Sequence, residues 1–326
     1  MKEFELISSY FADRGPKRKD VILGIGDDAA LTKVPNDNLL VVATDTMVEG
    51  VHFFKDAPAR SVGHKCLAVN LSDFAAMGAE PAWASVAMTL PDANEEWVKE
   101  FTEGLFAIAE YYNVQIVGGD TTQGPLAITV SVKGFIKEDK ALLRNGAKTG
   151  DWVYVTGQLG DAGLTVANKT SQIKLDSNIA TLSEQKFNYP SARIAAGHVL
   201  RHAATSAIDI SDGLIQDLGH ILKASKVSAE IELKQLPISP SVTIALSERQ
   251  AIELALIGGE DYELLFTVPE EKKSYLEQNA TAMGVDFHCI GQIKGGDTGI
   301  TLLLDGEKYP LPEKLGFQHF SETNHD

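Results

Sequence analysis

The feature that most restricts the fold is an alternation along the chain of short apolar runs rich in valine and isoleucine with longer segments of helical period. Short β-branched runs predict buried strands, and a 3.6-residue period over ten or so residues predicts helices. The expected strands are residues 39–44, 82–90, 115–118, 126–136, 152–156, 207–210, 228–233, 262–268, 287–293 and 299–304. The expected helices are residues 58–77, 94–112, 160–168, 190–203, 211–224, 248–257 and 270–283. The pattern predicts a mixed α/β (α+β) protein.

The length of 326 residues favours two domains. Between residues 137 and 150 the chain becomes polar and glycine-containing, which is typical of a connection between domains. We therefore expect an N-terminal domain over residues 1–140 and a C-terminal α/β domain over residues 141–326.

The charge balance excludes several partners. The chain has 29 basic and 45 acidic residues, a formal charge of −16, which argues against nucleic acid or an anionic membrane as a partner. An anionic substrate is still compatible, because bound metal ions can invert the local sign. Cys66 and Cys289 are far apart, so neither a disulfide framework nor a zinc site is indicated. Without a signal peptide or a run of 18 apolar residues, the expected location is the cytoplasm.

Two common nucleotide-binding motifs do not explain the chain. The P-loop pattern G-x-x-x-x-G-K-[ST] does not occur. Residues 24–29 (GIGDDA) match the dinucleotide pattern G-x-G-x-x-A, but two aspartates inside that turn would face the pyrophosphate. That site works by presenting bare backbone N–H groups to the phosphates, so we reject a dinucleotide-binding interpretation.

Aspartates recur at the ends of apolar runs, usually beside glycine or a hydroxyl residue. They are Asp27, Asp28, Asp45, Asp73, Asp120, Asp209 and Asp212. Asp209 stands between two isoleucines although aspartate is depleted in strands. Each one taken alone could be a helix N-cap or a turn residue. Their recurrence in one chain favours a common role.

Carboxylates that converge need cations. Two of them about 4 Å apart repel by roughly 4 kcal/mol at an effective dielectric constant near 20. Oxygen ligands without histidine or cysteine select hard ions, so Mg²⁺ is the expected metal. Gly118 and Gly119 beside Asp120 would let a phosphate approach the backbone. Mg²⁺, carboxylates and glycine turns together are typical of phosphoryl transfer.

Six segments, in this order, resemble the motif series of the thiamine-monophosphate kinase family, which belongs to the aminoimidazole-ribonucleotide-synthetase-like superfamily. The segments are 24–30 (GIGDDAA), 44–53 (with TDT and GVHF), 70–79 (NLSDFAAMGA), 118–122 (GGDTT), 209–214 (DISDGL) and 258–264 (GGEDYEL). The resemblance extends from about residue 3 to about residue 320.

The resemblance implies that ATP phosphorylates thiamine phosphate to thiamine diphosphate, with several Mg²⁺ ions between ATP and the aspartates. It implies the two-domain superfamily fold, in which the N-terminal sheet pairs with its copy in a homodimer through a shared β-barrel. The acceptor phosphate is largely ionised at pH 7, because its second pKa lies near 6. We therefore expect direct in-line transfer without a general base.

The resemblance also implies roles for individual residues. Metal ligands would be Asp28, Thr44, Asp45, Asp73, Asp120, Asp209 and Asp212, with the carbonyl of Ala43. Residues touching ATP would be Gly119, Asp120, Arg144 and Ser211. Residues touching thiamine phosphate would be His52, Glu260 and either Phe317 or Phe320, of which Phe317 fits the spacing better. We expect Asp45 and Asp120 to be catalytic, by holding the ion that bridges the reacting phosphates.

Several of these residues also have ordinary structural interpretations. His52 could be a half-buried residue at a strand end, Arg144 a solvated charge, and Glu260 a strand-edge charge. The pair Tyr111 and Tyr112 is more typical of packing, with an adenine platform as the alternative.

Other functions within the superfamily are aminoimidazole ribonucleotide synthesis, selenophosphate formation and hydrogenase maturation. Selenophosphate formation would need a reactive cysteine near a glycine-rich N-terminus, and none is present there. The hydrogenase-maturation protein would end in a cysteine, where this sequence has Asp326. A non-catalytic protein that binds divalent ions or nucleotides is the alternative of a different class.

Overall fold

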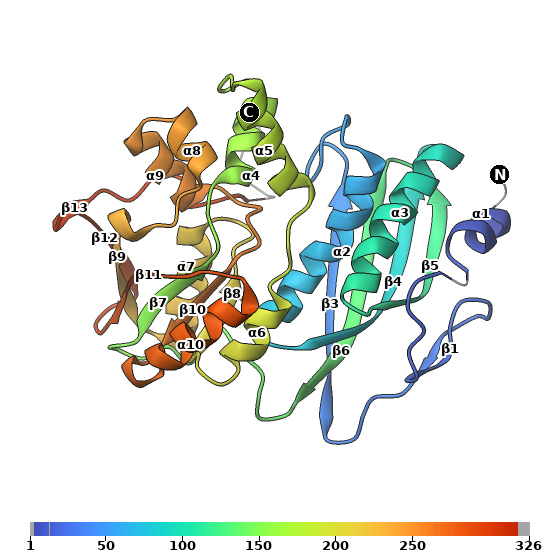
Figure 1. Cartoon of the computed structure of the whole chain (residues 1–326), viewed down its shortest axis with the longest axis horizontal. Coiled ribbons are helices and arrows are strands. Elements are labelled where there is room, and N and C mark those ends of the chain that lie inside the picture. Colours follow the sequence, from blue (N-terminus) through green and yellow to red (C-terminus); the bar gives the residue numbers. More distant parts are fainter. Residues whose placement is uncertain (1–2, 13, 319–326) are drawn as a thin grey trace, which may run out of the picture. The chain divides into compact units, whose positions relative to one another are not determined.

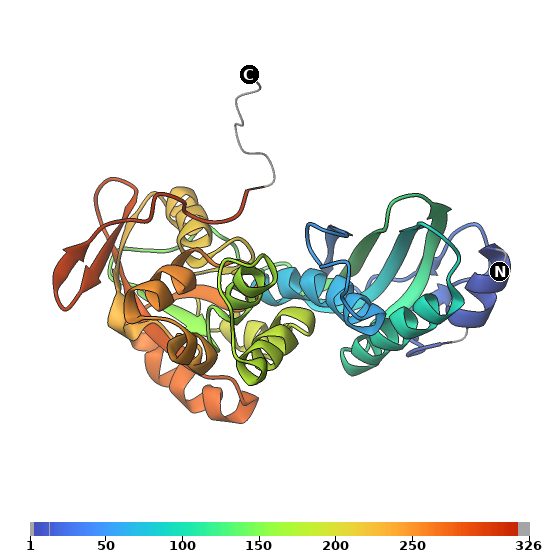
Figure 2. The ribbon, with the colours of Figure 1, turned by 90° about the horizontal axis from the view of Figure 1, so that it is seen from above.

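The computed structural model describes residues 3–12 and 14–318 (Figures 1 and 2). The chain divides into two compact units: Met1–Ala141 with Asn188–Ile194, and Leu142–Phe187 with Ala195–Asp326. The short segment Asn188–Ile194 therefore belongs to the first unit, which a boundary near residue 140 alone does not anticipate.

Two hydrogen bonds attach this segment to helices of the first unit. The Nε2 atom of His64 lies 2.9 Å from the carbonyl oxygen of Pro190, and the Tyr112 hydroxyl donates to the carbonyl oxygen of Ala192 at 2.7 Å. The ring of Tyr189 also packs edge-on against His64.

The first unit is built on a four-stranded sheet with the order β3-β6-β4-β5. The strands are β3 (Asn38–Val48), β4 (Glu80–Leu90), β5 (Gln115–Gln123) and β6 (Ala127–Lys137). Strand β6 pairs antiparallel with both β3 and β4, whereas β4 and β5 are parallel. A parallel pair needs a crossover connection, and helix α3 (Glu95–Tyr111) supplies it.

Helices α2 (Ala59–Ala76) and α3 cover one face of this sheet, and no helix in the described part of the chain covers the other face (Figures 1 and 2). Two glycines allow the helices to pack closely. A Cβ atom on Gly63 would lie 1.9 Å from the carbonyl oxygen of Phe101, and one on Gly104 would lie 1.9 Å from that of Arg60. Any side chain at either position would push the two helices apart.

The N-terminal segment consists of helix α1 (Glu3–Tyr10) and a short hairpin of β1 (Val21–Leu23) and β2 (Leu31–Thr32). Val21 of this hairpin packs, together with Val34, against the buried rings of Trp83 and Phe135. The loop of the hairpin, residues 24–30, is the first of the glycine- and aspartate-rich segments.

The second unit contains a seven-stranded sheet with the order β13-β12-β9-β11-β7-β10-β8. Its strands are β7 (Trp152–Thr156), β8 (Ser206–Asp209), β9 (Ser228–Glu232), β10 (Leu264–Val268), β11 (Phe287–Lys294), β12 (Gly299–Leu304) and β13 (Glu307–Tyr309). Its helices are α4 (Asp161–Lys169), α5 (Ser177–Asn188), α6 (Ile194–Leu200), α7 (Leu214–Ser225), α8 (Pro240–Ala245), α9 (Glu248–Ile257) and α10 (Lys273–Met283), with 3₁₀ turns η1 (Leu233–Gln235) and η2 (Glu270–Lys272). The pairs are antiparallel except that of β9 with β12.

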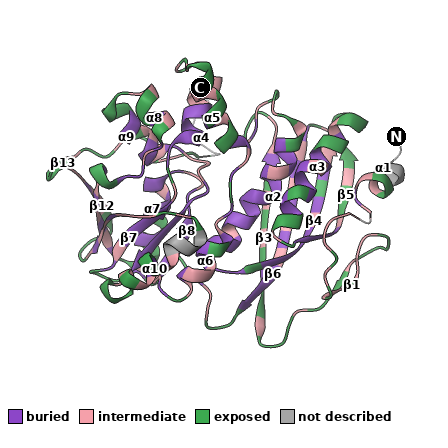
Figure 3. Cartoon of the chain, in the orientation of Figure 1, coloured by how far each residue is buried: buried purple, intermediate pink, exposed green. Residues whose placement is uncertain are grey.

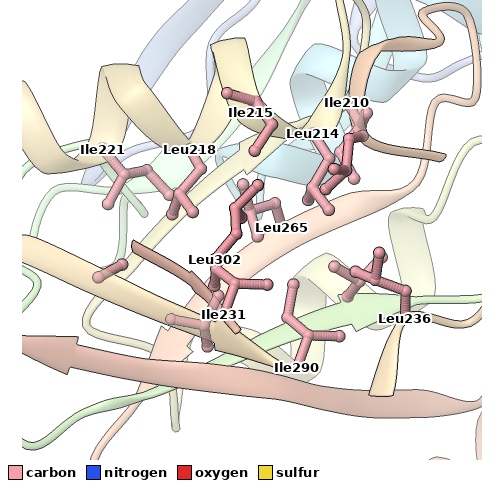
Figure 4. Packing of buried hydrophobic residues seen from close by; sticks show 14 of the residues in the cluster. Ile210, Leu214, Ile215, Leu218, Ile221, Ile231, Leu236, Leu265, Ile290 and Leu302 are labelled. Carbon is pink, nitrogen blue, oxygen red and sulfur yellow. The ribbon is translucent and has the colours of Figure 1, made fainter. Parts of the chain in front are cut away.

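The core of the second unit lies between α7 and the sheet (Figures 3 and 4). Leu214 and Leu218 of α7 are fully buried in one cluster with Ile231, Leu265 and Leu302 of three strands. Burying one such side chain stabilises a fold by roughly 1.5–3 kcal/mol. This packing fixes the start of α7, which follows directly on the fifth motif of the sequence.

Every expected strand is present, and most expected helices occur within a few residues of their predicted bounds. In place of the predicted helix 190–203 the structure has a shorter one, Ile194–Leu200. The residues before it belong, with Pro190, to the first unit. Helix α5 was not predicted from the sequence. Only three of its residues, Ser183, Phe187 and Asn188, are buried, and only one of these is apolar. Within residues 3–12 and 14–318, no helix combines the length and hydrophobicity needed to span a membrane.

Candidate active site

A cavity of about 790 Å³ lies in the first unit. Its charged lining consists of Asp27, Asp28, Asp120 and Lys133. Its apolar lining includes Phe11, Leu40, Trp83 and Met88. A pocket with apolar walls and a few convergent polar groups is the usual form of a small-molecule site, and this one presents carboxylates.

The carboxylates of this cavity come from two separate elements. Asp27 and Asp28 lie in the loop between β1 and β2, where Gly26 has a φ of +125°, and Asp120 lies in β5. The backbone N–H of Asp28 donates to the Asp27 carboxylate at 2.8 Å. Asp28 and Asp120, which are both candidate metal ligands, therefore line the same cavity.

The two glycines before Asp120 have different roles. A Cβ on Gly118 would meet no atom within 4 Å, so this position opens the cavity to a ligand. A Cβ on Gly119 would lie 1.9 Å from the carbonyl oxygen of Val86, so β4 and β5 could not pair with a side chain there. Both glycines line the cavity, and Gly118 is the one that leaves room for a phosphate.

Lys133 is a cation on the wall of this acidic cavity. Its ammonium donates to the Ser85 hydroxyl at 2.7 Å and to the Ser131 carbonyl at 3.1 Å, and burial lowers its pKa. Lys133 is not among the site residues predicted from the sequence. A lone lysine in an alternating strand carries no motif, and its position becomes evident only from the pairing of β6 with β4.

The structure places Ala43, Thr44 and Asp45 on β3, away from Asp120. Thr44 is exposed and donates to the Ser131 hydroxyl at 2.8 Å, on the face without helices. Asp45 alternates with Thr44 and therefore points to the face that α2 covers, together with the buried Met47.

Asp45 and Asp120 cannot hold the same ion within one copy of the chain. Strands β3 and β5 are the two edges of the sheet, three strand spacings or about 14 Å apart. Ligands to one Mg²⁺ lie about 2.1 Å from it, so two of them must be neighbours. In one copy of the chain, the sheet therefore separates the two carboxylates that were predicted to hold one bridging ion.

His52 lies in the turn after β3, and its ring orientation is fixed. The backbone N–H of Val48 donates to Nδ1 of His52 at 3.0 Å, so the proton of the neutral ring is on Nε2. The ammonium of Lys65, in α2, donates to the His52 carbonyl at 3.1 Å, and Lys65 is only 2% exposed. Asp73 lies two turns further along the same helix.

In the second unit, three segments that are distant in sequence are joined by backbone hydrogen bonds. The N–H of Glu260 donates to the Ser211 carbonyl at 2.8 Å, and the N–H of Phe317 donates to the Asp212 carbonyl at 3.0 Å. Four of the expected ligand contacts, Ser211, Asp212, Glu260 and Phe317, therefore lie together. Asp209, 6% exposed, ends the strand that leads into this group.

The segment around Glu260 has an unusual backbone. Glu260 and Tyr262 have φ values of +70° and +50°, a left-handed conformation that is costly for residues other than glycine. The Tyr262 hydroxyl donates to the Glu260 carboxylate at 3.2 Å. A Cβ on Gly259 would lie 2.5 Å from the Ser211 carbonyl oxygen, so the two segments approach closely only because residue 259 is glycine.

Asp217, in the first turn of α7, was missed by the sequence analysis. Its carboxylate accepts backbone N–H groups of Ser211, Asp212 and Gly213 at 3.1, 3.2 and 3.1 Å. Burial raises its pKa to about 7, and the Asp209 carboxylate adds to this effect. The available signal was an acid on the apolar face of an amphipathic helix, next to Leu218.

The remaining candidates have plainer surroundings. Arg144 is exposed in the second unit, and its carbonyl accepts from the Ser225 hydroxyl at 3.3 Å. Tyr112 is held by its bond to the Ala192 carbonyl while Tyr111 is 80% exposed, which favours the packing interpretation for Tyr112. Phe320 lies outside the described residues.

The donor set fits Mg²⁺ that is held jointly with a ligand. Across residues 3–12 and 14–318, no three acidic, histidine or cysteine side chains converge on a metal position. Mg²⁺ commonly takes one or two carboxylates and completes its shell with water and substrate phosphates. The carboxylates of Asp28 and Asp120 at one cavity match this requirement.

The chain matches known proteins along nearly its whole length. Residues 26–136 match the N-terminal domain of AIR synthase related proteins, and residues 148–302 match the C-terminal domain. Thiamine-monophosphate kinase of Escherichia coli K12 is 47% identical over 321 residues, which are 98% of each chain.

Solved structures agree with these matches. The crystal structure of thiamine-monophosphate kinase from Stenotrophomonas maltophilia superposes with a TM-score of 0.84 and 39% identity, over 90% of this chain and 93% of that one. A complex of AaThiL with AMPPCP and TMP superposes with a TM-score of 0.77 and 32% identity, over 91% and 92%. The mixed α/β fold with AIR-synthase-type N- and C-terminal domains is thereby confirmed, and this chain belongs to the thiamine-monophosphate kinase family.

Proposed function

We propose that this protein transfers the γ-phosphoryl group of ATP to thiamine phosphate, which yields thiamine diphosphate and ADP. The observation that carries the proposal is the identity of 47% over 98% of the chain to a thiamine-monophosphate kinase. The complex of AaThiL with AMPPCP and TMP, an ATP analogue and thiamine monophosphate, supports the same pair of substrates.

We assign the metal and nucleotide contacts in two groups. In the first unit, Asp28 and Asp120 would hold Mg²⁺ on the phosphates, with Gly118 and Gly119 beside them. Asp45, Asp73, Thr44 and the Ala43 carbonyl would serve other ions. In the second unit, Asp209 and Asp212 would hold metal while Ser211 and Arg144 contact ATP. Bound Mg²⁺ would neutralise the charge that develops on the transferred phosphoryl group.

His52, Glu260 and Phe317 would contact thiamine phosphate. Because Nδ1 of His52 accepts the Val48 N–H, Nε2 is the ring atom that would donate to a phosphate oxygen. A donor orients the acceptor phosphate and does not take a proton from it. The acceptor is already ionised at pH 7, so this arrangement supports direct in-line transfer without a general base.

We further propose that the protein is a homodimer in the cytoplasm, paired through the sheet of the first unit. Strand β3 is an edge strand, and Leu40 and Val42 on it are 50% and 57% exposed. Apolar side chains on an unpaired edge favour association. Val42→Lys should produce a monomer in sedimentation analysis, whereas Ile244→Lys on the exposed helix α8 of the second unit should not; a dimeric Val42→Lys protein would contradict this surface.

An ADP-release assay tests the reaction. Release should require both Mg²⁺ and thiamine phosphate, and thiamine itself should not replace the phosphate ester. A non-catalytic nucleotide-binding protein would bind ATP with Mg²⁺ and release no ADP. Another superfamily activity would release ADP only with a different acceptor. Either result would overturn the proposed function.

A further inference from the structure

Asp217 is a buried acid near the second group of candidate ligands. It is 2% exposed and belongs to the first turn of α7 (Leu214–Ser225). One oxygen, Oδ2, accepts the N–H groups of three consecutive residues, Ser211, Asp212 and Gly213, at 3.1–3.2 Å. A single carboxylate oxygen thus satisfies the whole turn that leads into the helix.

This arrangement changes what the start of α7 can bind. The first N–H groups of a helix lack partners within the helix, and phosphates often bind there. Here the protein's own carboxylate occupies the donors just before the helix. The side chains of the same turn that could reach a ligand carry oxygen: the Ser211 hydroxyl and the Asp212 carboxylate, whose Oδ2 also accepts the Gln216 amide at 2.9 Å. The turn therefore suits a cation better than a bare phosphate.

The same turn also supports the neighbouring segments. Its carbonyl groups accept from Glu260 and Phe317, and a Cβ on Gly213, whose φ is +134°, would lie 2.9 Å from the Ile257 carbonyl oxygen. Any movement of the turn would shift its metal candidates and both of these substrate candidates together.

We infer that Asp217 is a positioning residue: it holds residues 211–213 so that the turn presents oxygen ligands to Mg²⁺ on ATP. The inference rests on the proposed function for the identity of the ligand. It assigns no contact between Asp217 and the substrates, because its acceptor oxygen is directed to the backbone.

The test measures Mg²⁺-dependent ATP binding by calorimetry, which requires no phosphoryl transfer. Asp217→Asn keeps one acceptor oxygen but removes the carboxylate, whose ionised form strengthens all three hydrogen bonds. Removing such an outer partner of a metal site typically costs 10–100-fold in metal affinity. We expect the Mg²⁺ concentration for half-maximal ATP binding to rise by about 10–100-fold, and excess Mg²⁺ to restore most of kcat.

Asp151→Asn is the matched control. Asp151 is also buried, at 4% exposure, and accepts a backbone N–H from Lys148 and the Thr205 hydroxyl. Its loss should lower the melting temperature and leave the Mg²⁺ dependence unchanged. Because the two variants lose comparable buried carboxylates, a purely structural role for Asp217 predicts similar behaviour for both.

The outcomes separate the inference from the proposed function. A folded Asp217→Asn protein with the parent Mg²⁺ dependence, or an equal shift in Asp151→Asn, would overturn the inference. If Asp217→Asn does not fold, Asp217→Glu takes its place, because it keeps the charge and lengthens the side chain. The Mg²⁺ concentration for half-maximal ATP binding must then rise in Asp217→Glu, and an unchanged concentration overturns the inference. If the parent binds ATP with Mg²⁺ but phosphorylates nothing, the proposed function fails while the binding test still decides the role of Asp217.

Discussion

Gly259→Ala perturbs the candidate site of the second unit without changing charge or any hydrogen-bonding side chain. The added Cβ would lie 2.5 Å from the carbonyl oxygen of Ser211 and 3.3 Å from the Cα of Asp212. Ordinary contact begins near 3.4 Å, so the two segments must separate by about 0.9 Å (3.4 − 2.5 Å). The hydrogen bond from Glu260 to Ser211 lies directly in the path of this movement.

The two expected costs have different sizes. Overpacking of a well-packed contact lowers the free energy of unfolding by typically about 1–3 kcal/mol. A displacement near 1 Å of groups that position a substrate can lower the rate by about 100-fold. We therefore expect kcat/KM to fall by about 100-fold, equivalent to about 2.7 kcal/mol, in a protein that still folds.

The assay compares kcat/KM for thiamine phosphate with urea unfolding. Gly219→Ala is the control, because this glycine lies inside α7 and an added Cβ would meet nothing within 4 Å. Alanine there should stabilise the protein by about 0.5–1 kcal/mol and leave kcat/KM unchanged. If Gly259→Ala retains the parent kcat/KM, or loses stability alone, the close approach of these segments is not part of the site.

Three further predictions concern the first unit. Asp120→Asn should leave a folded protein with turnover reduced at least about 100-fold, because a carboxylate that holds Mg²⁺ stabilises the transition state by several kcal/mol; near-normal activity at saturating Mg²⁺ would remove Asp120 from the site. His52→Asn keeps an acceptor for the Val48 N–H but loses Nε2, so KM for thiamine phosphate should rise more than kcat falls; a 1,000-fold or greater loss of kcat at unchanged KM would indicate a proton-transfer role. Burial lowers the pKa of His64 below its ordinary value of 6.5, so the unfolded chain binds the proton more readily and stability should decrease as pH falls below about 6.5. Urea unfolding at pH 7.5 and 5.5 checks this, and His64→Gln, whose amide can also donate to the Pro190 carbonyl, should flatten the pH dependence; equal slopes would refute the assignment.

The sequence was a good guide to elements formed by local hydrophobic pattern. The runs at residues 152–156 and 299–304 are strands with those very bounds, because both are short and rich in β-branched or leucine side chains. Helix α5 (Ser177–Asn188) was not predictable in this way. Its surface is largely polar, and two of its three buried residues, Ser183 and Asn188, are polar as well, so its sequence shows no continuous apolar stripe.

The sequence suggested candidate site residues but not how the fold arranges them. The sequence does not show that β6 lies between β3 and β4, which puts Asp45 on β3 and Asp120 on β5 at opposite edges of the sheet. Conversely, Ser211 and Glu260 are neighbours because β8 pairs with β10, with Asp209 opposite Leu264. Long-range pairings of this kind have no signal in a single sequence.

The central claim is that phosphate passes directly from ATP to thiamine phosphate. The most direct measurement is incubation with γ-³²P-labelled ATP, Mg²⁺ and thiamine phosphate, followed by separation of the protein, ADP and thiamine diphosphate. Direct transfer should give labelled thiamine diphosphate, with the label in its terminal phosphate, formed in equal amount to ADP and with no label on the protein. Release of labelled inorganic phosphate without labelled thiamine diphosphate, or a phosphorylated protein formed from ATP alone, would contradict it.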